Sequence, residues 1–198
     1  MIDAVVFDLG GVLIELVGAP VLGAVTGHSE DEVWRRWLTC PWVRRYETGG
    51  CSTDEFAAGM IDAWELDQSP GEFLEAFRAW PRGLFPGAAE LVESLRPHAQ
   101  LALLSNTNAL HWDGQRDADR VQALFETAFL SHELGLVKPD REIFEHVVAA
   151  LDRPAERVLF LDDNQPNVDG ARAVGLRAAR VKGVAQARAA LVAEGVLA

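Results

Sequence analysis

The sequence predicts an α/β fold: a doubly wound parallel sheet with a small helical insert after the first strand. Short segments that are apolar throughout alternate with longer segments in which apolar residues recur every three or four positions. Strands that are apolar on both sides need helices on both faces of their sheet, which is typical of parallel sheets. A long stretch of helical pattern interrupts this alternation after the first strand, and it predicts the insert.

Five short apolar runs are predicted to be strands, because most of them are too short for helices. These runs are Val5–Phe7, Leu101–Leu104, Ala128–Leu130, Val158–Leu161 and Arg177–Val181. Helical patterns lie between them, with one buried face at Ala88, Leu91, Val92 and Leu95 and another at Ile143, Phe144, Val147, Val148 and Leu151. Pro139 and Pro166 are expected at the first positions of two helices, and Gly175 is expected to end the second of these.

Residues 16–84 are predicted to form the insert, and residues 1–15 with 85–198 to form the sheet domain. No further strand is expected before Leu101. Helices are expected around Ser29–Leu38, from Ser52 or Thr53 to Trp64, and near Gly71–Trp80, with a loop over Glu47–Cys51. Five of the six tryptophans fall inside the insert. We expect them chiefly to pack against one another in a small subdomain, the alternative being a wall that faces a ligand.

Composition excludes several classes of partner. The chain has 198 residues and a formal charge of −12, which opposes binding to the backbone of a nucleic acid. No apolar run approaches the roughly 20 residues that a membrane-spanning helix needs, so no membrane partner is expected. The start of the sequence lacks a secretory pattern, and Cys40 and Cys51 show no repeated spacing, so we expect a cytoplasmic protein. Its oligomeric state, monomer or homodimer, stays open.

Polar side chains follow the predicted strands at the points where each strand ends. They are Asp8, Ser105 with Asn106, Lys138, and Asp162 with Asp163. Parallel strands deliver these loops to one edge of the sheet, so the side chains are expected to converge. Three carboxylates at one edge repel one another unless a cation holds them, and hard oxygen ligands suit Mg²⁺. A lysine and a hydroxyl beside that cation would complete a cradle for a phosphate group.

The segments VVFDLGGVL, LLSN, the lysine of LGLVKPD and VLFLDDNQPNVDGARAVG resemble the four ordered motifs of the haloacid-dehalogenase-like hydrolases, over nearly the whole chain. The resemblance implies a Rossmann-like core, and the position of the insert is similar to the small helical cap of the first cap class. Within the superfamily, the motifs resemble most the sugar-phosphatase-like branch, which includes α-D-glucose-1-phosphate phosphatases, and the phosphatase domain attached to soluble epoxide hydrolases.

The resemblance also implies a role for each polar residue. Asp8 would attack phosphorus and become a transient aspartyl phosphate, while Lys138 would neutralise the growing charge. Ser105 and the backbone N–H of Asn106 would hold the phosphoryl oxygens of the substrate. Mg²⁺ would be bound by Asp8, the backbone carbonyl of Gly10, Asp163 and, directly or through water, Asp162. The implied reaction is Mg²⁺-dependent hydrolysis of a small phosphorylated metabolite, and we expect a sugar phosphate.

Gly10 is the departure that matters. Most phosphatases of this superfamily carry a second aspartate at this position, two residues after the nucleophile, and it protonates the leaving oxygen. A positioned acid or base is typically worth about 10² to 10⁴ in rate. Turnover is therefore expected to rise steeply with the acidity of the leaving group. The proton donor that replaces this aspartate could be Glu15, a cap residue such as Glu47 or His28, or water on the metal. Of these, Glu15 is favoured.

Two other functions stay open. A 2-haloacid dehalogenase also uses an aspartate nucleophile and needs no second aspartate, although the pair Asp162-Asp163 argues for a metal that dehalogenation does not use. A binding or regulatory module could keep the fold after losing turnover with the general acid. His98, His111, His132 and His146 share no metal-ligand spacing and are interpreted as structural.

Overall fold

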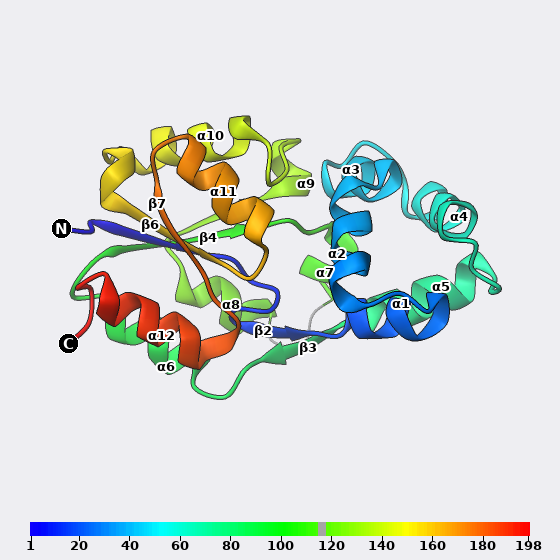
Figure 1. The fold of residues 1–198 in the computed structure, drawn as a ribbon, viewed down its shortest axis with the longest axis horizontal. Coiled ribbons are helices and arrows are strands. Elements are labelled where there is room, and N and C mark those ends of the chain that lie inside the picture. Colours follow the sequence, from blue (N-terminus) through cyan, green and yellow to red (C-terminus); the bar gives the residue numbers. More distant parts are fainter. Residues whose placement is uncertain (115–117) are drawn as a thin grey trace.

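The computed structural model, which describes residues 1–114 and 118–198, contains a five-stranded parallel sheet at its centre (Figure 1). The strands lie in the order β5-β4-β1-β6-β7. They are β1 (Ala4–Phe7), β4 (Gln100–Ser105), β5 (Thr127–Leu130), β6 (Val158–Asp162) and β7 (Arg177–Arg180). The five strands predicted from sequence and the doubly wound fold class are therefore confirmed.

Alternate residues of the central strand β1 enter two different hydrophobic cores. Val5 and Phe7 pack on the face covered by α6 (Ala88–Leu95), α8 (Ala118–Leu124) and α12 (Gly183–Ala193). Ala4 and Val6 pack on the opposite face, under α10 (Arg141–Leu151) and α11 (Gln165–Ala173). The side chains of β1 alternate between faces with the period of two of a strand. This two-sided burial is the reason why the strands read as continuous apolar runs.

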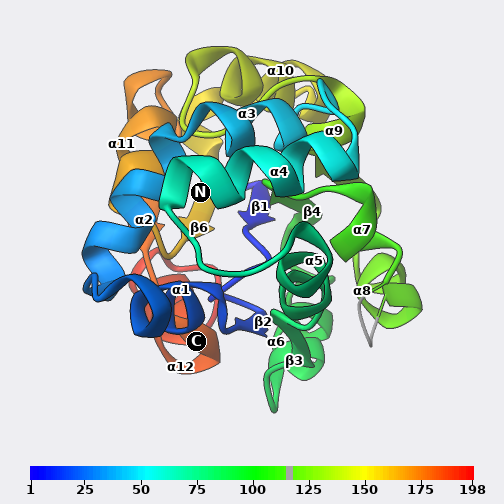
Figure 2. The ribbon, with the colours of Figure 1, turned by 90° about the vertical axis from the view of Figure 1, so that its right-hand side faces the viewer.

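Five further helices form a separate lobe beyond the end of the sheet (Figures 1 and 2). They are α1 (Gly18–Thr26), α2 (Glu30–Thr39), α3 (Pro41–Glu47), α4 (Thr53–Trp64) and α5 (Pro70–Arg78). Three of them begin with a capping box, in which Ser29, Ser52 and Ser69 each pair with a glutamate three residues later. The lobe has its own core, built largely of aromatic rings such as those of Phe56 and Phe77 at 5.2 Å. We refer to residues 16–84 as the cap.

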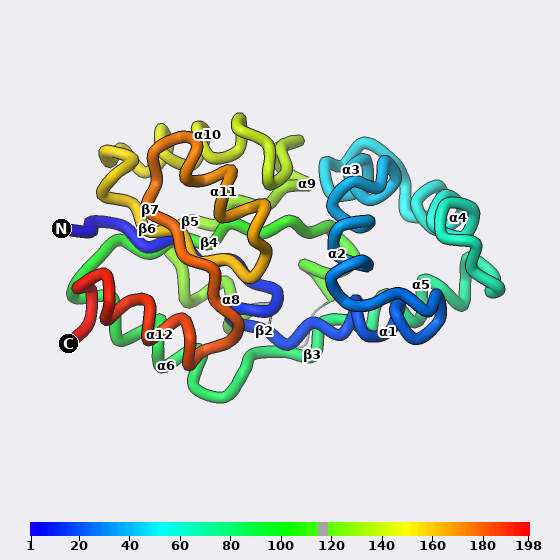
Figure 3. The backbone as a smooth tube through the Cα atoms, viewed as in Figure 1, coloured from blue at the N-terminus to red at the C-terminus, as the bar shows by residue number. Residues whose placement is uncertain are grey.

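Two short antiparallel strands connect the cap to the sheet. β2 (Ile14–Leu16) pairs with β3 (Pro81–Leu84), and Figure 3 shows the two chain segments running side by side between the lobes. The expectation that no strand would occur before Leu101 was therefore wrong. The strands are short, Gly83 and Pro81 disfavour strands, and Glu15 is exposed, so the local signal is weak.

Several helix boundaries also differ from the expectation. Pro139 does not begin a helix, because α10 starts at Arg141 with Asp140 as its N-cap, and the peptide bond from Lys138 to Pro139 is cis. Glu47 is the last residue of α3 rather than part of a loop. The proline of α11, Pro166, does lie in its first turn, and Gly175 follows that helix in the left-handed conformation with φ of 93°.

Short helices complete the described chain: α7 (Ala109–Trp112), α9 (Ser131–Leu134) and the 3₁₀ helix η1 (Ala155–Arg157). Within residues 1–114 and 118–198, no helix combines the length and the apolar character that crossing a bilayer requires.

Candidate active site

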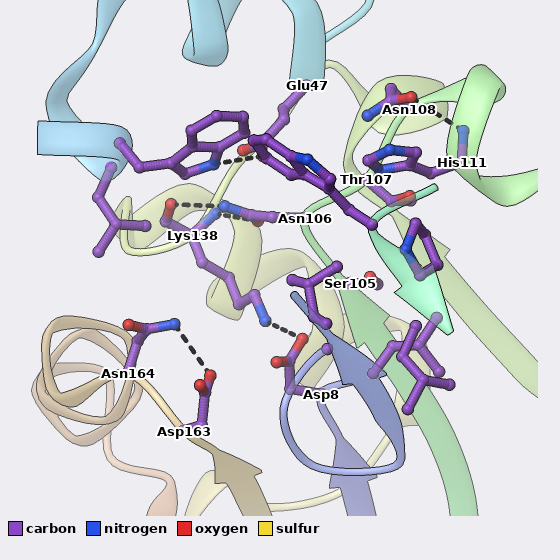
Figure 4. A pocket seen from close by; sticks show the side chains of 18 of the residues that line it. Asp8, Glu47, Ser105, Asn106, Thr107, Asn108, His111, Lys138, Asp163 and Asn164 are labelled. Atoms are coloured by element: carbon purple, nitrogen blue, oxygen red, sulfur yellow. Dashed lines mark hydrogen bonds and ion pairs between the residues drawn. The ribbon is translucent and has the colours of Figure 1, made fainter. Parts of the chain in front are cut away.

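Three neighbouring strands end at the same edge of the sheet, facing the cap (Figure 4). Asp8 follows the last residue of β1, and its backbone N–H donates to the carbonyl of Leu161 at 2.8 Å. Ser105 is the last residue of β4 and Asp162 the last of β6. All three side chains are buried. The sheet topology thus brings together polar groups that are far apart in sequence.

Lys138 is the centre of this group and is only 1% exposed. Its Nζ donates to Asp8 Oδ1 at 2.7 Å, to Asp162 Oδ2 at 2.7 Å and to the carbonyl of Leu104 at 3.1 Å. Three acceptors satisfy the three protons of an ammonium group. Burial alone would lower the pKa of Lys138, but Asp162 and Asp8 outweigh it and raise that pKa above its usual range. The ammonium is therefore held charged in a dry site.

The side chain of Asn106 fixes the backbone of Lys138. Its Oδ1 accepts from the Lys138 N–H at 2.9 Å, and its Nδ2 donates to the Lys138 carbonyl at 3.0 Å. The sequence indicated a role only for the backbone N–H of Asn106. This pair of hydrogen bonds between the β4 loop and the lysine loop depends on tertiary structure and has no local sequence signal.

The three carboxylates form a cluster that fits a divalent cation. Asp8, Asp162 and Asp163 each offer an oxygen, and these oxygens lie within 4.8 Å of one another. The two oxygens of Asp162 already accept hydrogen bonds from Lys138, from the Asn164 N–H at 2.8 Å and from Asn167. Among the side chains that the structure describes, only Asn164 donates to the Asp163 carboxylate, from Nδ2 at 2.9 Å. Asp163 is thus freer than Asp162 to serve as a direct ligand.

The electrostatics of the cluster favour a cation. Burial, with the charges of Asp162 and Asp163, raises the pKa of Asp8 to about 8, although Lys138 opposes the shift. Burial and Asp162 raise the pKa of Asp163 to about 7. One ammonium does not compensate three carboxylates in this dry environment. Mg²⁺ takes hard oxygen ligands of this kind and would supply the missing positive charge.

The two glycines after Asp8 are packed closely. A Cβ atom on Gly10 would lie 3.1 Å from Leu16 Cδ2, so the leucine fills the space beside that residue. A Cβ on Gly11, whose φ is 72°, would lie 2.6 Å from Asp163 Oδ2. Glycine at position 11 therefore allows both the left-handed backbone and the close approach of the carboxylate.

A cavity of about 90 Å³ lies between this sheet edge and the cap. Its cap side is mostly aromatic and apolar, with Leu16, Trp34, Trp37, Leu38, Phe77 and Trp80, and His111 of α7 lies beside these residues. Three of the five cap tryptophans thus line it, while Trp37 and Trp80 also pack against each other within the cap core, with ring centroids 5.2 Å apart and planes tilted by 53°. The two interpretations of these tryptophans, packing and pocket wall, both hold.

Glu47 is the one carboxyl group on the cap side among the described residues that line this cavity. It is 7% exposed and accepts a hydrogen bond from Trp37 Nε1 at 3.2 Å. Burial raises its pKa to about 7. Glu15, the favoured replacement for the missing acid, is exposed on β2 and lies outside this cavity, as does His28. The structure therefore does not support the preference for Glu15.

His111 lines the cavity, although its sequence context gave no reason to expect this. Its Nε2 donates to the carbonyl of Phe77 at 2.7 Å, which connects α7 to the cap. Burial lowers its pKa to about 4, so the ring is neutral near pH 7. No spacing rule could reveal this contact, because it exists only when the cap is in place.

Known proteins resemble this chain in sequence and in structure. Sesquiterpene phosphatase astK of Aspergillus oryzae is 28% identical over 87% of this chain and 86% of its own length. D-ribitol-5-phosphate phosphatase of Bacteroides thetaiotaomicron is 24% identical over 88% of this chain and 89% of its own. The magnesium complex of a HAD family enzyme, bt-2542 from the same organism, has a TM-score of 0.70 at 25% identity, covering 91% of this chain and 93% of that one.

The chain spans only 65% and 33% of the length of two further curated relatives. The model of a family described as haloacid dehalogenase-like hydrolase matches residues 2–175, which include every residue of the cluster. This match covers most of the chain and agrees with the resemblance of the four motifs. The chain belongs to the haloacid dehalogenase-like hydrolases.

Proposed function

We propose that this protein is a Mg²⁺-dependent phosphatase that hydrolyses a small phosphorylated metabolite through an aspartyl-phosphate intermediate. The observation that carries the proposal is the position of Lys138, which contacts Asp8 and Asp162 at 2.7 Å while Asp163 completes a carboxylate cluster. A site that binds and transfers a phosphoryl group must place cations beside a nucleophile. The phosphatases among the relatives support this choice of reaction.

Each residue has a proposed task. Asp8 attacks phosphorus, and Lys138 holds its carboxylate in place and offsets the charge that develops on the phosphoryl oxygens. Ser105 and the Asn106 N–H donate to those oxygens. Asp8, Asp163, the Gly10 carbonyl and, with less freedom, Asp162 would hold Mg²⁺, which supplies charge neutralisation when bound. The cap covers the site and excludes water.

The cavity limits the size of the substrate. About 90 Å³ is well below the roughly 300 to 1,000 Å³ of sites for drug-sized ligands, so the organic group is compact. Flat indole surfaces such as that of Trp34 suit the C–H face of a sugar ring. We therefore propose a small sugar phosphate as the substrate class, in keeping with the resemblance to the sugar-phosphatase-like branch.

The test is Mg²⁺-dependent phosphate release over a panel of metabolites. Wild type is compared with Asp8→Asn and with a matched control, Asp3→Asn, because Asp3 pairs with Arg157 outside the site. Asp8→Asn is expected to abolish release, and Asp3→Asn to retain it. Release that survives Asp8→Asn would overturn the proposal.

Dehalogenation is the second candidate, because Gly10 leaves the position of the usual second aspartate without a side chain. The carboxylate cluster argues against it, since that reaction needs no metal. Chloride release from 2-chloropropionate without Mg²⁺ would reverse this order.

A binding module without turnover is tested separately, because Mg²⁺ with beryllium fluoride mimics the aspartyl phosphate. Failure of that pair to raise thermal stability, together with no phosphate release, would favour the binding module.

A further inference from the structure

Glu47 lines the cavity on the side opposite the charged sheet edge (Figure 4), and any role for it as a proton donor rests on the proposed phosphatase function. Glu47 ends α3 and reaches into the cavity from the cap side, across from Asp8 (Figure 4). In phosphoryl transfer the attacking and leaving oxygens lie roughly in line through phosphorus. A substrate attacked by Asp8 from the sheet edge therefore directs its leaving oxygen toward the cap.

Position 10 cannot supply the proton. Glycine has no titratable side chain, and a Cβ atom on Gly10 would lie 3.1 Å from Leu16 Cδ2. Glu15 is exposed and outside the cavity. His111 lines the cavity, but Nε2 keeps its proton bonded to Phe77, and its pKa of about 4 leaves Nδ1 without a proton near neutrality.

Glu47 has the properties of a proton donor. Burial raises its pKa, while the Trp37 indole, the charges of Lys138 and Arg44 and the Asn106 side chain lower it, and the balance is about 7. A carboxyl group with this pKa is partly protonated at neutral pH and can both give and take a proton. An anionic phosphate bound nearby would raise the pKa further and favour the acid form.

We propose that Glu47 is the general acid and base of this enzyme, in place of the aspartate absent from position 10. In the first step Asp8 forms a bond to phosphorus, the bond from phosphorus to the leaving oxygen breaks, and that oxygen takes the proton of Glu47. The products are the alcohol, Asp8 carrying the phosphoryl group, and a Glu47 carboxylate. In the second step the Glu47 carboxylate takes a proton from the attacking water as the water oxygen bonds to phosphorus. The bond from phosphorus to Asp8 breaks, and free phosphate, the Asp8 carboxylate and protonated Glu47 result.

The test compares Glu47→Gln with wild type and with Glu15→Gln as the matched control. Two substrates are used, an alkyl phosphate with a poor leaving group and p-nitrophenyl phosphate with a good one. For Glu47→Gln we expect kcat/KM to fall by about 10² to 10⁴ for the alkyl phosphate and by less than about tenfold for the aryl phosphate. Glu15→Gln is expected to match wild type on both.

The second step gives an independent readout. Without a base, hydrolysis of the aspartyl phosphate becomes slow, so Glu47→Gln should release a burst of nitrophenolate stoichiometric with the chain and then turn over slowly. Equal losses of kcat/KM on both substrates, with no burst, would overturn the inference. Absence of Mg²⁺-dependent turnover in wild type would instead refute the proposed function itself.

A second variant keeps the test valid if Glu47→Gln does not fold. Trp37→Phe removes the indole N–H that lowers the pKa of Glu47, while an aromatic ring stays in the cap core. The pKa of Glu47 should rise, so the basic limb of the alkyl-phosphate rate profile should move to higher pH. An unchanged limb would count against Glu47 as the acid.

Discussion

The two sides of the cavity, which we call the sheet wall and the cap wall, differ in their chemistry. The sheet wall is a set of buried charges, in which the Lys138 ammonium joins two carboxylates and each of its protons has a fixed partner. The cap wall is mostly aromatic and, among the described lining residues, carries one carboxyl group, that of Glu47. Under the proposed function the two walls would have different tasks: the paired charges would orient the reacting groups, and the rings of the cap core would set the shape that the substrate must fit.

Removal of the sheet wall's ammonium should have the largest effect. Lys138→Met leaves Asp8 and Asp162 facing each other without their shared cation, and breaking a buried ion pair costs about 3 to 5 kcal/mol of folding free energy. Phosphate release should also disappear. Urea unfolding measures the loss, with exposed Lys182→Met as control. Similar losses in both variants would show that the sheet wall does not depend on its paired charges.

The sheet wall should also respond to pH and to Mg²⁺. The pKa values of Asp8 and Asp163 rise from 3.8 to about 8 and about 7 in the folded metal-free protein. The folded state then binds protons that the unfolded state has released, so its stability falls as pH rises from about 4 to about 8. Mg²⁺ binds the ionised carboxylates, so it should raise the melting temperature more near pH 8 than near pH 5.5.

The control for this experiment is Asp163→Asn, which removes one of the two titrating groups. It should flatten the pH dependence of the melting temperature and weaken the Mg²⁺ effect. A Mg²⁺ effect that is larger at the acidic end would contradict the charge balance of this wall.

Alanine substitutions at Gly11 and Gly27 test whether the close contact between the Gly11 backbone and the Asp163 carboxylate matters for Mg²⁺ binding. Gly11 and Gly27 have φ of 72° and 75°, but a Cβ would meet Asp163 at Gly11 and nothing within 4 Å at Gly27. Both alanine variants should lose stability of about 1 kcal/mol or somewhat more from the left-handed backbone. Only Gly11→Ala should also weaken Mg²⁺ binding, measured by calorimetry. Equal Mg²⁺ affinities would show that Asp163 tolerates displacement.

The cap wall should give the smallest effect. Trp34 is half-buried, lines the cavity and packs against the outside of the cap core, so Trp34→Ala should cost little stability. We expect KM to rise several-fold for substrates with a ring and to change little for acetyl phosphate, with kcat nearly constant. Trp42→Phe, outside the cavity, is the control. A large fall in kcat would mean that the cap wall takes part in the chemistry.

Much of the sheet wall could be predicted from sequence because it follows from topology. Val5–Phe7 and Val158–Leu161 are apolar throughout, and parallel strands place the residues after them at one edge. The convergence of Asp8, Asp162 and Asp163 needed no further information. The hydrogen bonds from Asn106 to Lys138 could not be predicted, since they depend on the path of the lysine loop.

The cap was less predictable. The first cap helix contains Gly18, Pro20 and Gly23, which are poor helix formers, while Ala19 and Leu22 of this helix pack into the cap core and stabilise it. The orientation of Glu47 depends on how the cap meets the sheet domain. That interface joins residues far apart in sequence, so no local pattern separates Glu47 from Glu15.

The hairpin of β2 and β3 is the place where the chain enters the cap from the sheet domain and returns to it. Glu15 pairs with Gly83, so the chain leaves the sheet domain and returns to it at neighbouring positions. A module attached in this way can be exchanged or shortened without rerouting any strand of the sheet. Descendants of one catalytic scaffold could thus acquire new substrates by trading this module, while the inherited charge cluster stays intact.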